Sequence, residues 1–594
     1  MTALLVVSGC AVEVAPPTTE KLPSGKADDG RPSSPDIIPD SYQLLIPSDQ
    51  APDETFSFCS GIDPFLSLPQ TLTLDDAEVV CRRGNDCLRA PYAGEASDPD
   101  GFGFEMSFKR GTVTWSATVS EDLGPGMIVP GIYTVDVRLP ELPSYGRNTS
   151  RGRRPINNLP LSAFSADYEI RHANGTDDVE VGLAPQRDEA RWISLGVYRF
   201  DEGDRAELTL KAGDRPVPVG AARFRRLSDP NLTNAAWLSF FSANQYAHFW
   251  SLGPMLADFG FGYPGEGERW RRCAVDRRYL RSMEWEAREA GRRLSDDEIV
   301  GIGACVADWW RSEASAEARG GAPYSITSQF ERYLVQVPDP EMDIQFFTGG
   351  HLDEDKFEFE AGSTQVLWAY HAERNMVVIA FRGTELEEEQ LFRDVATDID
   401  LFLKRPPAPY GDEWGKTHRG FMNAFREVED MVMAKVETLH PTTQIFITGH
   451  SLGAAVATLL GSRIMAQMDA DDDLTRYMIR GIYTFGSPRV GNRGFSAKYH
   501  TMAANIGVQL FRVRNASDIV TRIPTDIPLF ADYEHVGPML YIDRDGGLEL
   551  IPSRVSWGLG NSIADHDIGA YYRHLEAGRH DPRFAPFDTC PEYF

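Results

Sequence analysis

Ser451 has the sequence context of an activated nucleophile. It is the central residue of a Gly-x-Ser-x-Gly pattern formed with Gly449 and Gly453, and it follows a short apolar run and precedes a helix of small residues. A strand that turns this sharply into a helix needs glycines there, because side chains would press the strand against the helix. A serine hydroxyl is a weak nucleophile, so a base and backbone oxyanion donors must lie nearby. The alternative interpretation is a packing turn of small residues.

A base and an acid that follow the serine in the chain are expected for this arrangement. His566 opens a helix near the C-terminus, where its ring can reach the edge of a sheet, and Asp518 follows the strand-like run 509–514. An acid at that place can accept the Nδ1 proton of the histidine, so that Nε2 is left to take the serine proton. Asp526 is the weaker acid candidate, because prolines on both sides place it in an irregular loop.

Other residues near these motifs have simpler interpretations. His535 precedes a strand and is expected to hydrogen-bond a loop, and His418 and His450 are expected to be packing or turn residues. The oxyanion needs two donors. One is the backbone N–H of Leu452, and the other is predicted at Thr384, in the loop that follows the apolar run 377–381.

The apolar patterns predict an α/β fold preceded by an all-β region. Continuous apolar runs at 377–381, 445–447, 481–485 and 509–514 alternate with helical patterns, which indicates a mostly parallel sheet covered on both faces. Further helices are expected at 238–250 and 297–310. Residues 102–227 instead show short alternating runs with turn signals, which favours a β-sandwich.

Composition restricts the partners and the compartment. The chain has 594 residues, 42% of them hydrophobic, and a net charge of −29, which argues against nucleic acid, because phosphate binding needs a basic face. Residues 1–10 end on Val-Ser-Gly-Cys and are similar to a bacterial lipoprotein signal peptide, with Cys10 as the lipidation site; the alternative is a frayed apolar terminus. We therefore expect an exported protein with a membrane anchor, in the cell envelope or outer membrane, or outside the cell.

The remaining six cysteines form an even set, which favours disulfides in an exported protein. We expect Cys81 to pair with Cys87, and Cys273 with Cys305, because each pair lies within one local segment. Six cysteines allow 15 connectivities, so the pairing stays open. Their spacing does not match a metal site, and neither a metal nor another cofactor is expected.

Seven ordered motifs between about residues 365 and 573 resemble the class 3 (fungal-type) lipases. They are Phe381-Arg-Gly-Thr384, Thr417-His-Arg-Gly-Phe421, Thr448-Gly-His-Ser-Leu-Gly-Ala454, Tyr483-Thr-Phe-Gly-Ser-Pro-Arg-Val-Gly-Asn492, Arg514-Asn-Ala-Ser-Asp-Ile-Val-Thr-Arg-Ile-Pro524, Tyr533-Glu-His-Val-Gly537 and Asp565-His-Asp-Ile-Gly-Ala-Tyr571. The resemblance implies an α/β-hydrolase fold, with Ser451 as nucleophile, Asp518 as acid, His566 as base, and Thr384 and Leu452 as oxyanion donors. It also implies a lid between Thr384 and His418, whose first residues, from Glu385, are unusually acidic. The insertion 263–348 matches no part of that family.

The expected organisation has five parts: a signal peptide (1–10), a flexible linker (11–50), an unassigned cysteine-bearing segment (51–101), the β-sandwich (102–227) and the hydrolase domain (228–594). The runs 192–200 and 221–225 make the sandwich similar to golvesin and xanthan-lyase-like domains, which implies glycan contact; a structural spacer is the alternative. The predicted activity is serine ester hydrolysis on glycerolipids. Two alternatives are an acyl or feruloyl esterase acting on polysaccharide and an inert surface-binding lipoprotein.

Overall fold

The computed structural model of the chain describes the following residues: 71–74, 78–81, 87–88, 106–108, 111–122, 124–139, 148–149, 152–153, 165–182, 191–212, 217–246, 249–311, 326–327, 330, 343–353, 358–383, 402–525, 532–551 and 564–579. The predicted signal peptide with Cys10 and the linker lie outside these residues, as do residues 384–401 of the segment between Thr384 and His418 that is predicted to hold the lid. In the part of the chain that is described, no helix has the length and apolar character needed to cross a membrane.

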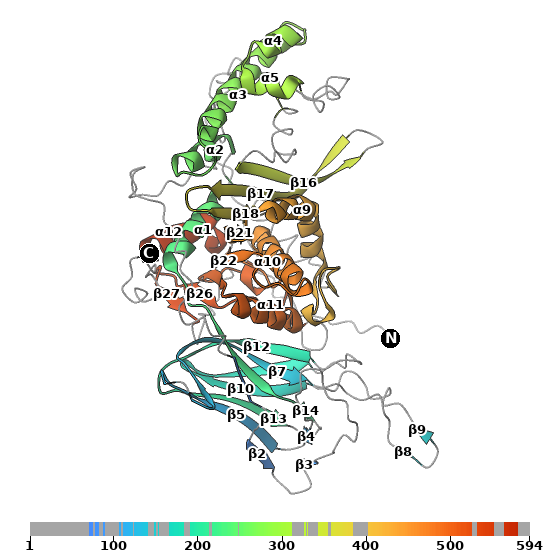
Figure 1. Cartoon of the computed structure of the whole chain (residues 1–594), viewed down its shortest axis with the longest axis vertical. Helices are drawn as coiled ribbons and strands as arrows, with labels where there is room; N and C mark the ends of the chain where they lie inside the picture. Colours follow the sequence, from blue (N-terminus) through green and yellow to red (C-terminus); the bar gives the residue numbers. More distant parts are fainter. Residues whose placement is uncertain are drawn as a thin grey trace, which may run out of the picture. The chain divides into compact units, whose positions relative to one another are not determined.

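An eight-stranded sheet forms the centre of the α/β part (Figure 1). Its strands in spatial order are β16 (Ile344–Asp353), β17 (Glu358–His371), β18 (Met376–Phe381), β21 (Gln444–His450), β22 (Met478–Phe485), β24 (Gln509–Asn515), β26 (Met539–Ile542) and β27 (Leu548–Leu550). The five strands from β18 to β26 pair in parallel, and antiparallel strands flank them at both edges. The predicted mostly parallel sheet is confirmed for this central part.

Helices cover both faces of the sheet, and alternate residues of each strand face the two layers. On β18, Val377, Ile379 and Phe381 share a core with α9 (Arg419–Thr438), α10 (Leu452–Ala470) and α11 (Arg493–Ile506). Val378 and Ala380 share the other core with α1 (Leu232–Asn244) and α12 (Ile568–Gly578). Burial on both faces explains why the central strands read as unbroken apolar runs.

Two helix predictions differ from the structure. The single helix expected at 238–250 is α1 followed by α2 (Phe249–Asp258), and the helix expected at 297–310 is α4 (Asp296–Val300) followed by α5 (Ala304–Arg311). Gly301 and Gly303 lie at the second break, where glycine weakens a helix. Helix α1 begins earlier than expected because Asn231 caps it by accepting a hydrogen bond from the N–H of Asn234. The start was missed because α1 is buried almost all round, so its sequence lacks the one-sided apolar period that marks a surface helix.

The described residues before α1 form an antiparallel, β-rich region, as predicted. One antiparallel sheet has the order β1 (Thr71–Leu74), β15 (Ala222–Leu227), β7 (Gly131–Leu139), β12 (Arg191–Phe200); the second has the order β11 (Gly175–Gly182), β10 (Ser165–His172), β13 (Arg205–Ala212), β5 (Gly111–Val119), β2 (Glu78–Cys81), with β6 (Met127–Ile128) beside β5. The inward residues of both sheets form one core. β1 and β2 belong to the segment 51–101 that the sequence left unassigned. The resemblance to golvesin-like domains stays a prediction.

Short strands complete the described structure. They are β3 (Cys87–Leu88), β4 (Met106–Phe108), β14 (Val217–Val219), β8 (Asn148–Thr149), β9 (Gly152–Arg153), β19 (Leu403–Lys404), β20 (Thr417–His418), β23 (Gly491–Asn492) and β25 (Tyr533–Glu534). The side chains of Cys81 and Cys87 lie outside the described part, so their predicted disulfide stays a prediction.

Arginines of β15 join the all-β region to the α/β part. Arg223 forms a buried ion pair with Asp136 of β7 at 2.6 Å and also donates to the hydroxyl of Thr501 in α11. Arg225 donates to the carbonyl of Thr501 and to the side chain of Asn505, both at 3.1 Å. A buried guanidinium is costly unless it is paired, so these contacts fix the two parts against each other.

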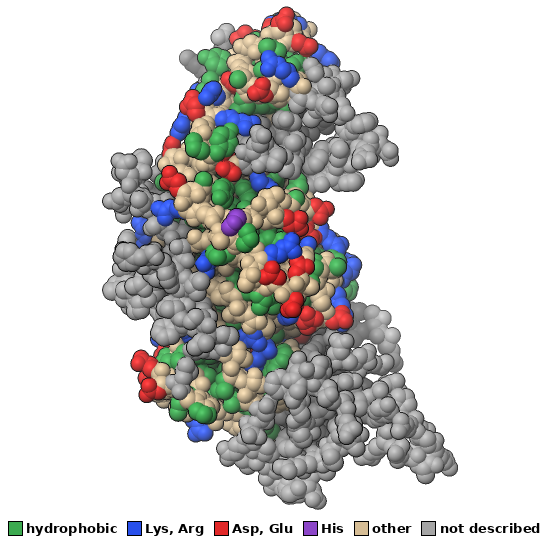
Figure 2. Space-filling model, in the orientation of Figure 1, with side chains coloured by type: hydrophobic (Ala, Val, Ile, Leu, Met, Phe, Trp, Pro, Cys, Tyr) green, Lys and Arg blue, Asp and Glu red, His purple; other side chains and the backbone are tan. Residues whose placement is uncertain are grey.

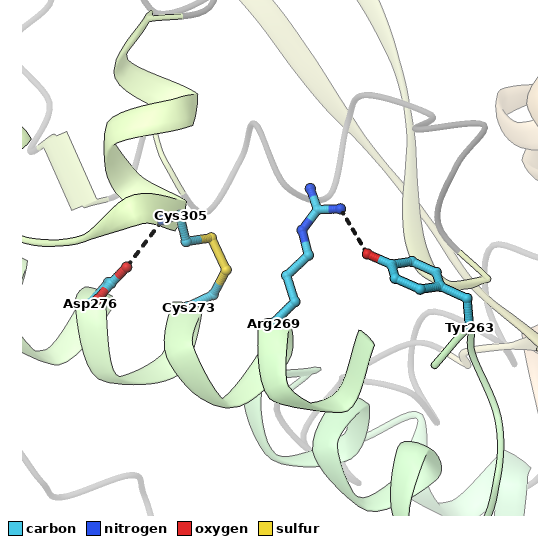
Figure 3. Close-up of a disulfide and its surroundings, with 5 residues drawn as sticks. All are labelled: Tyr263, Arg269, Cys273, Asp276 and Cys305. Atoms are coloured by element: carbon cyan, nitrogen blue, oxygen red, sulfur yellow. Dashed lines mark hydrogen bonds between the residues drawn. A yellow bond between two sulfur atoms is a disulfide. The ribbon is translucent and has the colours of Figure 1, made fainter. Parts of the chain in front are cut away.

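The insertion 263–348 contains a long helix, α3 (Glu266–Glu289), held to α5 by a disulfide (Figure 3). Cys273 and Cys305 form this disulfide, as predicted. Asp276, one turn further along α3, accepts a hydrogen bond from the N–H of Cys305 at 3.2 Å. At the start of α3, the buried carboxylate of Glu266 accepts hydrogen bonds from the N–H groups of Asp343 and Ile344 next to β16. Helix α3 is therefore fixed to the sheet at one end and to α5 further along.

Candidate active site

Ser451 lies at the turn between β21 and α10, in a strained backbone conformation. Its φ is 57° and its ψ is −125°, a combination that residues with a side chain rarely adopt. A Cβ at Gly449 would overlap the carbonyl of Gly453, and one at Gly453 would overlap the carbonyl of Phe381 in β18. The close approach predicted from the two glycines is therefore confirmed, and it holds the strained serine at the carboxyl end of the sheet.

Asp518 and His566 are hydrogen-bonded to each other. The Nδ1 of His566 lies 2.8 Å from Oδ2 of Asp518, and both side chains are buried. Asp518 also accepts hydrogen bonds from the N–H of Val520 at 2.9 Å and from the hydroxyl of Tyr571 at 2.5 Å. Because the carboxylate can only accept, the His566 proton is on Nδ1. Nε2 of His566 is buried and has no hydrogen-bond partner among the described residues, so it is available to a neighbouring hydroxyl.

The end of β22 brings the serine close to this pair. The N–H of Ser451 donates to the carbonyl of Phe485 at 3.0 Å. The next residue, Gly486, has a φ of +58°, and a Cβ there would lie 2.8 Å from Cε1 of His566 and 2.9 Å from Oδ2 of Asp518. Ser451, Asp518 and His566 therefore form one cluster around Gly486. The ends of β21 and β22 and the η5 turn (Ala564–His566) position this cluster.

The loop that carries His566 has its own anchors. The carbonyl of Asp565 accepts from the side-chain amide of Asn515 at 3.0 Å, and its carboxylate accepts from the N–H of Ser517 at 2.9 Å. Asp567 caps α12 by accepting from the N–H groups of Gly569 and Ala570. The residues on both sides of the histidine are thus fixed to β24 and to α12.

His450, predicted to be a packing or turn residue, contacts the site directly through His566 and is hydrogen-bonded to Tyr246. Its Nδ1 lies 2.8 Å from the hydroxyl of Tyr246, and its Nε2 lies 2.8 Å from the carbonyl of His566. A carbonyl only accepts, so Nε2 carries the proton and Nδ1 accepts from Tyr246. The rings of His450 and His566 are 4.4 Å apart. Burial, together with the nearby His566, lowers the pKa of His450 well below its ordinary value, so the ring is neutral.

The sequence contained little sign of this role for His450. Its partner Tyr246 lies just after α1, 204 positions earlier in the chain, and only the packing of α1 against β21 brings the two together. A histidine next to the nucleophile was the one available signal.

The structure describes one of the two predicted oxyanion donors, Leu452. Leu452 is the first residue of α10, so its N–H belongs to the first turn, which has no acceptor within the helix. Thr384 lies outside the described residues. Its neighbour Gly383 is described, and a Cβ there would lie 3.1 Å from Cβ of Ser451. The loop after β18 therefore borders the serine, and the role of Thr384 stays a prediction.

The other histidines considered from the sequence have structural contacts. His535 lies 2.8 Å from the carbonyl of Thr521, and His418 caps α9 by accepting from the N–H of Phe421. Asp526, the weaker acid candidate, lies outside the described residues. No group of three or more His, Cys, Asp or Glu side chains in the described ranges is placed to hold a metal ion.

Comparison with known proteins finds similarity in this part of the chain. Residues 378–527 match the family model for lipase (class 3). The chain is 27% identical over 238 residues to the triacylglycerol lipase OBL1 of Arabidopsis thaliana, and 32% identical over 228 residues to the phospholipase A1-II 6 of Oryza sativa subsp. japonica. It is 36% identical over 129 residues to the secreted mono- and diacylglycerol lipase 1 of Fusarium solani.

These matches cover part of each protein. They span 33%, 35% and 21% of this chain and 44%, 52% and 34% of the three relatives, so the chain spans about half the length of the curated relatives or less. The matched family segment contains Ser451 and Asp518, and it ends before His566.

Proposed function

We propose that this chain, which carries the class 3 lipase sequence over residues 378–527, is a serine hydrolase of acyl esters of glycerolipids. The observation that supports it most is the hydrogen bond between Asp518 and His566, which leaves Nε2 of the histidine without a partner among the described residues. His450, the residue before the strained Ser451, contacts the same histidine. The family match and the relatives named as triacylglycerol lipase, phospholipase A1 and mono- and diacylglycerol lipase support the choice of lipid esters.

In the proposed reaction the hydroxyl of Ser451 attacks the ester carbonyl, and Nε2 of His566 takes its proton. Asp518 holds the ring in the tautomer with the proton on Nδ1 and stabilises the imidazolium that forms. The N–H of Leu452, together with Thr384, receives the developing oxyanion. The same histidine then gives the proton to the leaving alcohol, and water hydrolyses the acyl-enzyme through the same steps in reverse order.

We also propose that the enzyme acts outside the cytoplasm and is tethered through Cys10. The Cys273–Cys305 disulfide supports an oxidising compartment, and the Fusarium solani relative is named as secreted. Glycan contact by the all-β region is retained as part of the proposal on the strength of the sequence resemblance alone.

The test is hydrolysis of nitrophenyl butyrate and emulsified trioleoylglycerol by the full chain and by Ser451→Ala. We expect the variant to lose activity by about 10³-fold or more on both substrates, with an unchanged circular dichroism spectrum. Retained activity would remove Ser451 from the mechanism. Cleavage of the nitrophenyl ester without cleavage of trioleoylglycerol or phosphatidylcholine would limit the enzyme to small esters. Release of ferulate from feruloylated polysaccharide would instead support the esterase alternative.

A further inference from the structure

The turn that follows Asp518 leaves one carbonyl group to be satisfied by another segment. The η4 turn (Val520–Arg522) is a 3-10 helix, in which each hydrogen bond joins residues three apart. The next bond of the series would run from residue 524 to the carbonyl of Thr521, but Pro524 has no N–H. The Thr521 carbonyl is buried and therefore needs a donor from outside the turn.

His535 provides that donor. Its Nε2 lies 2.8 Å from the carbonyl of Thr521, and because a carbonyl only accepts, Nε2 carries the proton. The hydroxyl of Thr521 in turn donates to the carbonyl of Asp518 at 2.8 Å, and the N–H of Val520 donates to Oδ1 of Asp518 at 2.9 Å. Two consecutive hydrogen bonds thus connect the His535 ring to the main chain of the proposed acid.

Three arginines lie near His535: Arg512, Arg489 and Arg514. Burial, together with these positive charges, lowers the pKa of His535 well below its ordinary value. The ring is therefore neutral, and it can donate to the Thr521 carbonyl without adding a further positive charge to this group.

Helix α11 fixes the segment that carries His535. The hydroxyl of Ser496 donates to the carbonyl of His535 at 2.8 Å. Two residues further on, the N–H of Gly537 donates to Nε2 of His500 at 2.8 Å. Both acceptor and donor groups of this segment are thus held by one helix, so the imidazole is presented from a fixed backbone.

Arg493, the first residue of α11, connects this support to the all-β region. Its Nη1 pairs with Glu534, the residue before His535, at 2.9 Å and lies 3.3 Å from the carbonyl of Ser194 in β12. The register of β12 against β7 shifts between Ser194 and Gly196, as in a β-bulge. Figure 2 shows acidic, basic and apolar side chains mixed on the face that it presents, whereas Arg493 is covered, with 6% of the residue exposed. The charged contact that supports His535 is therefore a buried one.

We propose that His535 is a positioning residue for Asp518, because it holds the carbonyl of Thr521 and with it the turn that carries the carboxylate. A catalytic group has to be held to within about 0.5 Å of its productive place. The 2.8 Å hydrogen bond from Nδ1 of His566 to Asp518 is the contact that a displaced turn would lengthen. The inference rests on the proposed function, in which Asp518 orients His566, and it assigns a part in the reaction to a histidine that was expected only to hydrogen-bond a loop.

The experiment measures steady-state kinetics of the full chain on nitrophenyl butyrate. We expect His535→Phe to lower kcat roughly 10- to 100-fold at constant KM, because a displaced Asp518 no longer fixes the ring of His566. His535→Gln can donate to the same carbonyl and should stay within about fivefold of the parent, and Thr521→Val, which lacks the hydroxyl, should lose about tenfold. The control is His172→Phe, which replaces a buried histidine of β10 and should leave kcat unchanged.

A double-variant cycle distinguishes positioning from a general loss of structure. In a chain that already carries Asp518→Asn, adding His535→Phe should lower kcat by less than about threefold, because no carboxylate is left to misplace. The same factor of loss in both backgrounds would overturn the proposal, as would equal losses in His535→Phe and His535→Gln. Thermal unfolding checks that each variant is folded. Should His535→Phe not fold, Thr521→Val decides, and an unchanged kcat in that variant overturns the proposal.

The same measurements separate this inference from the proposed function. Full activity of Asp518→Asn would remove Asp518 from the mechanism and so refute the proposed function. A large loss in Asp518→Asn, with parent activity in a folded His535→Phe, would refute the role of His535 alone.

Discussion

The Nε2–H of His450 donates to the main-chain carbonyl of His566 over 2.8 Å, so the residue before the nucleophile holds the backbone of the proposed base. Tyr246 fixes the tautomer that makes this bond possible. The chain of contacts joins the turn after α1, the end of β21 and the η5 turn without passing through Asp518. His450 is therefore a positioning residue, separate from the carboxylate that orients the imidazole ring.

Changing this contact should reduce turnover without weakening substrate binding. We expect His450→Phe to lower kcat on nitrophenyl butyrate roughly 100-fold at constant KM, because His566 loses its backbone anchor and a misplaced base is costly. His450→Gln can still donate to the carbonyl and should recover most of the activity. Tyr246→Phe should cost roughly tenfold, the scale of one lost hydrogen bond. Tyr410→Phe is the control, since it removes a partly buried 2.8 Å hydrogen bond to Ser462 of α10 away from the site. An equal loss in the Phe and Gln variants at position 450 would contradict this role.

Replacing Asp518 should lower kcat far more than replacing Tyr571, whose hydroxyl donates a hydrogen bond to Asp518. Asp518→Asn presents an amide that stabilises the wrong tautomer of His566, and we expect kcat to fall by about 10³- to 10⁴-fold with the fold retained. Tyr571→Phe removes one donor and leaves the carboxylate, so a loss of about tenfold or less is expected. Steady-state kinetics of both variants across pH measures these two losses of kcat. A small effect of Asp518→Asn would show that another acid orients the histidine.

Gly486 should be essential for activity for two reasons: its φ is positive, and a Cβ there would overlap His566 and Asp518. In Gly486→Ala the new methyl group would lie within 3 Å of His566 and Asp518, and the positive φ adds a backbone cost of about 1 kcal/mol. We expect more than 100-fold lower kcat. Gly203→Ala has a φ of +83° with nothing within 4 Å of the Cβ, so it carries the backbone cost alone and should stay active. Comparable activity in the two variants would show that the His566–Asp518 pair tolerates displacement.

The free energy of unfolding should decrease on acidification because of His418 and His500, two buried histidines outside the proposed active site. Burial lowers the pKa of His418 and of His500 from 6.5 to about 4. Between these values the unfolded chain binds protons that the folded chain does not, so the free energy of unfolding increases with pH. The contribution of each histidine to the free energy of unfolding is fully present above pH 6.5. It is lost as the pH falls towards 4, by up to roughly 3 kcal/mol for each group.

Urea unfolding at pH values across this window measures the effect, and His500→Gln tests its source. The Nε2 of His500 accepts from the N–H of Gly537 at 2.8 Å, and glutamine can accept the same bond without titrating. The variant should show a shallower pH dependence. An identical slope in the variant would mean that other groups dominate the acid destabilisation.

The sequence by itself determined the elements whose signals are local. Gly449 and Gly453 around Ser451 indicated the sharp turn because a backbone contact at that distance admits no side chain, and the structure shows that contact. The apolar runs of the central strands indicated a sheet covered on both faces. The order serine, acid, histidine singled out Asp518 and His566, which lie 2.8 Å apart. Cys273 and Cys305 were paired correctly because they lie within one local segment, 32 positions apart.

Tertiary structure decided what depends on contacts between distant segments. His450 contacts Tyr246 across 204 positions, and Gly486 lies against Asp518 of the loop after β24 and His566 of η5, so neither relationship leaves a periodic pattern in the sequence. Helix α3 is far more charged than α1, and its sequence does not say which of its few apolar residues are covered. Packing buries nearly all apolar residues of α1, whereas in α3 it leaves Val275, Tyr279 and Trp285 exposed, because the side of α3 that packs is occupied by other residues.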